Sequence, residues 1–286
     1  MQISIVLGTY NRLNYLKLTV KSIRAELSLF NCCSEIIVVD GGSTDGTIGW
    51  LVKQKDIISI IQHNHGKWKG AELKKKSWGY FMNLGFKCAK GKYICMVSDD
   101  CLIVPGSVKN GYELIESKML NNEKIGGAAF YWRDIPGPDI YWVGELFNST
   151  YLVNHGIFVK SIIEELGYID ESNYKFYYAD SDLCLRMNNA GYKILLSGKS
   201  FIEHYSHANS RQRKLNSVSV NEDKKYFMDK WSGEVNPVNP YFNKDTLEIE
   251  FNDLTGTYLQ FNKAKLLNTS VVKNRIINFI KKILGK

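Results

Sequence analysis

The sequence predicts an α/β protein: a mostly parallel sheet flanked by helices and followed by a C-terminal helical extension. Two observations lead to this fold class. Short apolar, β-branched runs alternate with helix-length segments over roughly the first hundred residues, and these runs are apolar throughout. Strands of that kind are buried on both faces, which is typical of a parallel sheet whose crossover helices cover both sides.

The elements are expected in a βαβα order. Strands are predicted at 3–7, 35–40, 57–61 and 92–98, and helices at about 12–30, from about 44, at about 77–89 and near 160–166. A later helix would begin with Asp180 as its N-cap and end at Gly191, because aspartate caps helix starts and glycine favours the turn that ends them. Residues 125–151 are rich in glycine, proline and aromatic side chains, so they are expected to form a flat sugar-binding surface or an irregular loop.

Composition limits the possible classes of protein. The 286 residues, 44% of them hydrophobic, suffice for one large domain or a domain with an appendage. The six cysteines show no CxxC spacing, the N-terminus shows no basic-then-apolar leader, and no apolar run reaches the length of a membrane span. We therefore expect a cytoplasmic protein with reduced thiols.

The net charge of +8 is concentrated near the C-terminus, where no acidic residue follows Asp253. Residues 266–286 place Val272, Ile276, Phe279, Ile280 and Ile283 on one helical face, with basic side chains away from it. Such a basic amphipathic helix is typical of an anchor at an anionic membrane surface, and the alternative is that it docks on the catalytic domain or pairs with another chain. We expect no nucleic-acid partner.

Three polar segments that a purely structural role does not readily explain follow the predicted strands. They are "GTYNR" (8–12), "DGGSTDGT" (40–47) and "SDD" (98–100). In α/β sheets, ligands bind beyond the carboxyl ends of the strands. The second segment lacks the spacings of a dinucleotide fingerprint and of a P-loop, so neither a dehydrogenase nor an NTPase is favoured.

The adjacent carboxylates of Asp99 and Asp100 repel one another, so their pairing calls for an explanation. They could cap a turn, remain solvated at the surface, or bind a hard divalent cation. Mg²⁺ and Mn²⁺ prefer oxygen ligands and commonly share their coordination with substrate phosphates. A cation that bridges a diphosphate would also offset the repulsion.

Four blocks of the sequence carry a resemblance to a known family. "SIVLGTYNR", "EIIVVDGGSTDGT", "MNLGFKCAKGKYICMVSDDCLIVPGS" and "YYADSDLCLRMNNAGYKI", the last followed by "EHYSHANS", resemble in order and spacing the family-2 glycosyltransferases of the GT-A fold. The resemblance covers roughly residues 1–210. It implies an inverting enzyme that uses Mg²⁺ or Mn²⁺ to transfer a sugar from a nucleotide-sugar donor to an acceptor hydroxyl.

The resemblance also implies roles for individual residues on the donor side. Thr9 and Tyr10 would line the base pocket, and Asp40 would accept a hydrogen bond from the base or ribose. Asp100 corresponds to the metal ligand of the family's D-x-D motif, and Asp99 to a contact with the ribose or the metal. The first aspartate of that motif is Ser98 here.

On the acceptor side, the resemblance makes Asp180 the general base. The glutamate that precedes this base in the family is Ala179 here, and Asp182 would support the site with Arg186 as an ion-pair partner one turn later. The metal site would be completed by a histidine, with His204 preferred and His207 as the alternative.

These expectations define a domain organisation and a set of partners. Residues 1–210 would form the catalytic domain, with its nucleotide-binding part at about 1–105 and its acceptor part at about 106–210, followed by an extension at 211–265 and the helix at 266–286. The acceptor would be a glycan or a lipid-linked sugar in surface polysaccharide, capsule or glycan synthesis, reached from the cytoplasmic side of the membrane. Two alternatives remain open: a non-catalytic nucleotide- or carbohydrate-binding protein of this fold, and a sugar nucleotidyltransferase.

Overall fold

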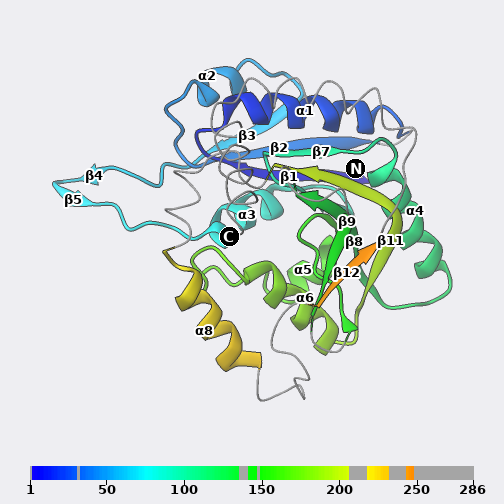
Figure 1. Ribbon diagram of the computed structural model, residues 1–286. Coiled ribbons are helices and arrows are strands. Elements are labelled where there is room, and N and C mark those ends of the chain that lie inside the picture. Colours follow the sequence, from blue (N-terminus) through cyan, green and yellow to red (C-terminus); the bar gives the residue numbers. More distant parts are fainter. Residues whose placement is uncertain are drawn as a thin grey trace, which may run out of the picture.

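The computed structural model describes residues 2–30, 33–134, 141–146, 149–205, 218–231 and 243–247. A ten-stranded sheet with helices on both sides forms its centre (Figure 1), which confirms the predicted fold class. The first half of the chain builds a parallel sheet in the order β6-β1-β2-β3, from β1 (Ile3–Thr9), β2 (Ser34–Asp40), β3 (Ile57–Ile61) and β6 (Tyr93–Met96). These are the strands expected from the apolar runs.

Helices α1 (Leu13–Leu27) and α3 (Trp78–Cys88) cover opposite faces of this parallel sheet (Figure 1). Gly85 allows α3 to approach closely, because a Cβ at this position would lie 2.4 Å from Val6 Cγ1. The parallel register pairs Thr9 with Asp40, so the polar residues that end β1 and β2 lie side by side at the carboxyl edge.

The second half of the chain extends the sheet with a mixture of directions. Its strands are β7 (Cys101–Ile103), β8 (Ile125–Asp134), β9 (Tyr141–Glu145), β10 (Gly156–Val159), β11 (Lys193–His204) and β12 (Asn243–Leu247). β10 lies antiparallel between β6 and β8, whereas β11 runs parallel to β8 and antiparallel to β7. The expectation of a surface or loop at 125–151 was wrong for its first part, because β8 is buried from Ile125 to Arg133.

The remaining helices are α2 (Thr47–Leu51), α4 (Ser107–Leu120), α5 (Lys160–Glu165), α6 (Ala179–Asn189) and α8 (Val220–Trp231). The predicted cap of α6 was wrong: Tyr178, with a φ of 67°, precedes the helix, and Asp180 lies in its first turn. Gly191 follows α6 with a φ of +82°, which confirms the predicted end. α2 is short, since it spans only 5 residues.

Two further parts of the chain bear on function. The hairpin of β4 (Lys67–Trp68) and β5 (Ala71–Glu72) projects away from the body of the protein (Figure 1). The alternative histidine His207 and the amphipathic segment 266–286 lie outside the described residues. Within the described ranges, no helix has the length and apolar character needed to cross a membrane.

Candidate active site

Arg12 joins the two adjacent carboxylates at the carboxyl edge of the sheet. Its Nη1 atom donates to Asp99 Oδ1 and to Asp100 Oδ2, each at 2.8 Å. Both carboxylates are buried, whereas the Arg12 side chain is 18% exposed. The guanidinium therefore offsets the repulsion between the two carboxylates.

The two carboxylates differ in their affinity for a proton. Burial raises the pKa of Asp99 to about 6, against the opposing effect of the Arg12 charge. Burial also acts to raise the pKa of Asp100, but the charges of Arg12 and His204 outweigh it and hold that pKa below its ordinary value. Asp100 is consequently the carboxylate that stays ionised over the wider pH range.

His204 lies at the end of β11, beside Asp100. Its Nδ1 atom donates to Asp134 Oδ1 at 2.9 Å, and its Nε2 atom lies 3.5 Å from Asp100 Oδ1. Burial would lower the pKa of His204, but the neighbouring carboxylates of Asp100 and Asp134 raise it to about 9. Asp100 Oδ1 is buried and has no hydrogen-bond donor.

The backbone around the carboxylates is fixed by side chains of α1 and by β11. Thr19 Oγ1 lies 2.9 Å from the carbonyl oxygen of Asp99 and 2.8 Å from that of Cys101. The amide of Tyr205 donates to the carbonyl of Asp100 at 2.9 Å. These contacts hold the turn between β6 and β7 in place, so the carboxylates are fixed by a rigid support.

Asp40 and Tyr10 form the neighbouring part of the site. Asp40 Oδ1 accepts from the amides of Gly42 and Ser43, both at 2.8 Å, while Oδ2 is buried and has no donor. The ring of Tyr10 lies against that of His65, with centroids 5.0 Å apart. A buried carboxylate oxygen without a partner costs free energy, so Asp40 Oδ2 is suited to a ligand donor.

Asp180 lies in the first turn of α6. Its Oδ1 atom accepts from the amide of Ser181 at 2.9 Å, and burial raises its pKa to about 6. Asp182, one position further on, is fully buried and accepts from Arg186 Nε at 2.8 Å and from Lys230 Nζ at 2.7 Å. The ion pair between Asp182 and Arg186 is the one predicted from their spacing.

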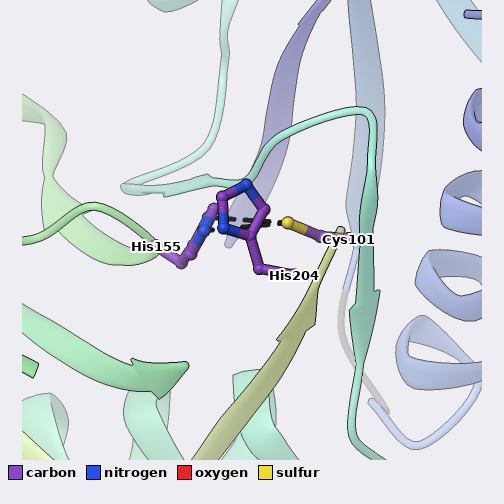
Figure 2. Close-up of side chains that lie close together, drawn as sticks. All are labelled: Cys101, His155 and His204. Atoms are coloured by element: carbon purple, nitrogen blue, oxygen red, sulfur yellow. Dashed lines mark hydrogen bonds between the residues drawn. The ribbon is translucent and has the colours of Figure 1, made fainter. Parts of the chain in front are cut away.

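Cys101 and His155 extend the cluster inward (Figure 2). Both are fully buried, and the Cys101 Sγ atom lies 3.7 Å from His155 Nε2. Burial lowers the pKa of His155 to about 3, so its imidazole is neutral. His155 precedes Gly156, where a Cβ would come within 2.2 Å of the Ala128 carbonyl oxygen, so a residue with a side chain does not fit at that position.

The structure brings most of the predicted site residues together. Thr9 donates to Asp99 Oδ2 at 2.7 Å, and Asp40 lies beside Thr9 in the sheet. Arg12 connects Asp99 to Asp100, and Asp100 in turn lies beside His204, so these residues form one chain of contacts. Among the described contacts of Asp180, none reaches this chain.

Four members of the cluster were not predicted: Arg12, Cys101, Asp134 and His155. Arg12 is the one basic residue within the three strand-end segments, and this position could have identified it as a partner of the carboxylates. Cys101 directly follows the carboxylates in sequence. His155 and Asp134 carry no local signal, because strand pairing far along the chain brings them to the site.

Comparison with known proteins gives this arrangement a context. Residues 4–122 match the protein family described as glycosyl transferase family 2. Among curated protein sequences, none matches the chain. The solved structure of residues 1–349 of TarS from S. aureus is 17% identical with a TM-score of 0.52, over 76% of this chain and 65% of that one.

Two further structures share the fold at similar identity. TarS 1–349 in complex with UDP is 15% identical with a TM-score of 0.52, over 81% of this chain and 72% of that chain. Mannosyltransferase PcManGT from Pyrobaculum calidifontis, in complex with GDP-Man and Mn²⁺, is 15% identical with a TM-score of 0.52, over 74% of this chain and 60% of that chain.

The match spans less than two thirds of the first TarS structure and of the mannosyltransferase. At these identities the likeness establishes a shared fold, and the family match covers the segment that contains Thr9, Tyr10, Asp40, Asp99 and Asp100. The resemblance of the sequence motifs is thereby confirmed: residues 4–122 match glycosyl transferase family 2, and the described part of the chain has the GT-A fold of known glycosyltransferases.

Proposed function

We propose that this protein is an inverting glycosyltransferase that moves a sugar from a nucleoside diphosphate sugar to an acceptor hydroxyl. One observation carries the proposal. Two buried carboxylate oxygens, Asp40 Oδ2 and Asp100 Oδ1, have no hydrogen-bond donor, and they lie at the carboxyl edge of the sheet, where ligands of α/β folds bind. Each suits one part of such a donor: Asp40 suits the N–H or O–H of a nucleoside, and Asp100 suits the cation that accompanies a diphosphate.

The donor set at Asp100 fits a divalent cation. Asp100 Oδ1 accepts no hydrogen bond but lies 3.5 Å from its ion-pair partner His204 Nε2, and the charges of Arg12 and His204 outweigh the effect of burial and hold the pKa of Asp100 below its ordinary value. Asp100 and His204 would hold Mg²⁺ or Mn²⁺, as Mn²⁺ accompanies GDP-Man in the mannosyltransferase structure. When bound, the cation would supply charge stabilisation to the departing diphosphate.

The nucleoside would lie between the ends of β1 and β2. Asp40 Oδ2 accepts a hydrogen bond from the base or the ribose, and Tyr10, with His65 beside it, offers an aromatic surface to the base. Thr9 holds Asp99 through the hydrogen bond of 2.7 Å, so that Asp99 faces the ribose or the cation from a fixed position.

Asp180 would act as the general base. Its pKa, raised to about 6 by burial, lies near neutrality, where a carboxylate combines an ionised state with useful basicity. It would take the proton from the acceptor hydroxyl as that oxygen attacks the anomeric carbon from the face opposite the diphosphate. This displacement inverts the anomeric configuration and releases a nucleoside diphosphate.

The experiment is a screen of UDP-, GDP- and dTDP-sugars with candidate glycan acceptors in Mn²⁺, read out as release of nucleoside diphosphate. We expect one donor to support release, and we expect Asp180→Asn to lower the rate by about 10²–10⁴-fold, the usual contribution of a general base. Tight donor binding without release under any acceptor would instead support the non-catalytic alternative.

A further inference from the structure

A group of metal-ligating side chains lies on the inner side of Asp100. Cys101 begins β7 and is the direct partner of His204 in the antiparallel pairing with β11. The carbonyl of His155 accepts from the amide of Phe130 at 3.0 Å, so its backbone is tied to β8. The sheet therefore aims three ligating side chains at one point (Figure 2), and their ligand atoms lie within 4.8 Å of one another.

The spacing of these atoms suits a small tetrahedral site. Cys101 Sγ lies 3.7 Å from His155 Nε2 and 3.9 Å from Nδ1. Bond lengths of about 2.3 Å to sulfur and about 2.0–2.1 Å to nitrogen place the two atoms roughly 3.6 Å apart around a tetrahedral Zn²⁺. The pair needs almost no movement to reach that separation, because the Cys101 and His155 side chains already face each other.

The remaining ligands are also prepared for a metal. His204 donates its Nδ1 proton to Asp134, an arrangement that fixes the ring and directs Nε2 toward a metal. Asp100 Oδ1, which has no donor, lies 3.5 Å from that nitrogen. An ion can enter past His204, whose side chain is 16% exposed.

We propose that Cys101, His155 and His204, with Asp100 as fourth ligand, form a binding site for a borderline divalent cation such as Zn²⁺ or Co²⁺. Thiolate and imidazole ligands favour these ions over Mg²⁺. On binding, the Cys101 S–H bond breaks, its proton passes to the buffer, and the sulfur lone pair bonds to the metal. His204 releases the proton from its Nε2 atom in the same way.

The consequence for catalysis rests on the proposed function. Asp100 and His204 are also the residues proposed to hold the Mg²⁺ or Mn²⁺ of the donor, so the two kinds of ion exclude each other. Zn²⁺ is therefore an inhibitor that competes with the donor's cation. Cys101 and His155 would make this inhibition stronger than at a site with oxygen ligands alone.

The test uses the full chain and Co²⁺ without any sugar donor. One equivalent of Co²⁺ is expected to produce a thiolate-to-cobalt charge-transfer band in the near ultraviolet, which is lost in Cys101→Ser and retained in Cys95→Ser. Cys95 is the matched control, since it is also a fully buried free thiol and lies on β6, the strand that precedes β7 in the chain. His155→Gln is expected to weaken Co²⁺ binding by at least about tenfold, because it removes one ligand.

A wild-type protein without the charge-transfer band, or a band that persists in Cys101→Ser, would overturn the inference. If a variant fails to fold, the presence or absence of the charge-transfer band in the wild-type protein tests the proposed site. Competition adds a second readout: Zn²⁺ should release Mn²⁺, seen as the signal of free Mn²⁺ by electron paramagnetic resonance. The cobalt spectrum requires no donor, so its failure and the failure of the proposed transfer are separate results.

Discussion

Arg12 is the residue on which the stability of the two buried carboxylates depends. It is the cation that contacts both Asp99 and Asp100, at 2.8 Å each. Replacing it with alanine removes the cation that contacts Asp99 and leaves Asp100 with His204 alone, and breaking such a buried pair is strongly unfavourable. We expect Arg12→Ala to lower the free energy of unfolding by about 2–4 kcal/mol in denaturant titration, and Mn²⁺ to restore part of this loss.

Arg24 provides the matched control for this prediction. It pairs with Asp56 on the surface at 2.7 Å, with side chains 39% and 52% exposed. Surface pairs of this kind contribute about 0–1 kcal/mol. Equal losses in Arg12→Ala and Arg24→Ala would show that the carboxylates do not depend on Arg12.

Asp180 gives a residue-scale prediction about stability and pH. Burial raises its pKa to about 6 in the folded state, above the unfolded value of about 3.9. The folded protein thus gains stability from protonated Asp180 below about pH 4 and loses that contribution as the pH rises through about 6. Asp180→Asn keeps the side chain neutral and should be more stable than the wild type at pH 7 by about 1–2 kcal/mol, allowing for partial exposure of Asp180.

The measurement is the thermal unfolding of both proteins between pH 4 and pH 8. The advantage of Asp180→Asn should disappear at the acid end, where the wild-type carboxyl is also neutral. Transfer by the wild type should fall below about pH 6, because the base becomes protonated. A variant less stable than the wild type at pH 7 would contradict the assigned environment of Asp180.

At the scale of elements, α8 holds the segment that leads to the proposed base. Asp223, fully buried in the first turn of α8, accepts from the amides of Lys175, Phe176 and Tyr177 at 2.8–2.9 Å. Trp231, at the end of the same helix, donates to Asp182 at 3.1 Å. This helix therefore clamps the residues on both sides of Asp180.

Asp223→Asn should lower kcat more than it changes the KM for the donor, because it loosens the position of Asp180 and leaves Asp40 and Asp100 untouched. The loss of charged hydrogen bonds to three amides should also cost about 1–3 kcal/mol of stability. Glu222→Gln is the control, since Glu222 precedes Asp223 on α8 and its side chain is 66% exposed. If kcat is unchanged while stability falls, α8 has a purely structural role.

The elements also show where sequence reasoning succeeds. Apolar runs located β1, β2, β3 and β6 to within a few residues, because a strand that is buried on both faces consists of consecutive apolar residues. The same rule failed at 125–134, where glycines and aromatic side chains form the buried strand β8. Close approach of neighbouring strands explains these glycines: a Cβ on Gly127 would lie 2.5 Å from the Ile157 carbonyl oxygen, a contact made far along the chain.

At the scale of the whole molecule, the candidate site is assembled from distant parts of the chain. Strand-end positions predicted Asp40, Asp99 and Asp100, since the carboxyl ends of parallel strands share one edge. His155 was missed because tertiary contacts alone bring it to the site, whereas Arg12, 88 positions before Asp100, was missed although it is a basic residue within a strand-end segment. The roles of Thr9, Tyr10, Asp180 and His204 came from the family resemblance and remain predictions.

The charge distribution of the whole chain leads to a prediction about membranes. Lys273, Arg275, Lys281, Lys282 and Lys286 follow the last acidic residue, Asp253. Basic residues next to an apolar helical face favour anionic lipid. Removing residues 266–286 should abolish sedimentation with anionic liposomes and leave nucleoside diphosphate release with a soluble acceptor intact. Unchanged sedimentation would refute the proposed contact.

The central claim is that Asp100 holds the cation of the donor and Asp180 performs the chemistry. It is tested most directly by the rise in melting temperature that the donor produces with and without Mn²⁺, since a ligand of the folded state stabilises it by mass action. Asp100→Asn should lose the Mn²⁺-dependent part of the rise, and Asp180→Asn should keep it in full while losing transfer. An Asp180→Asn protein that loses the Mn²⁺-dependent rise, beside an Asp100→Asn protein that keeps it, would contradict the account.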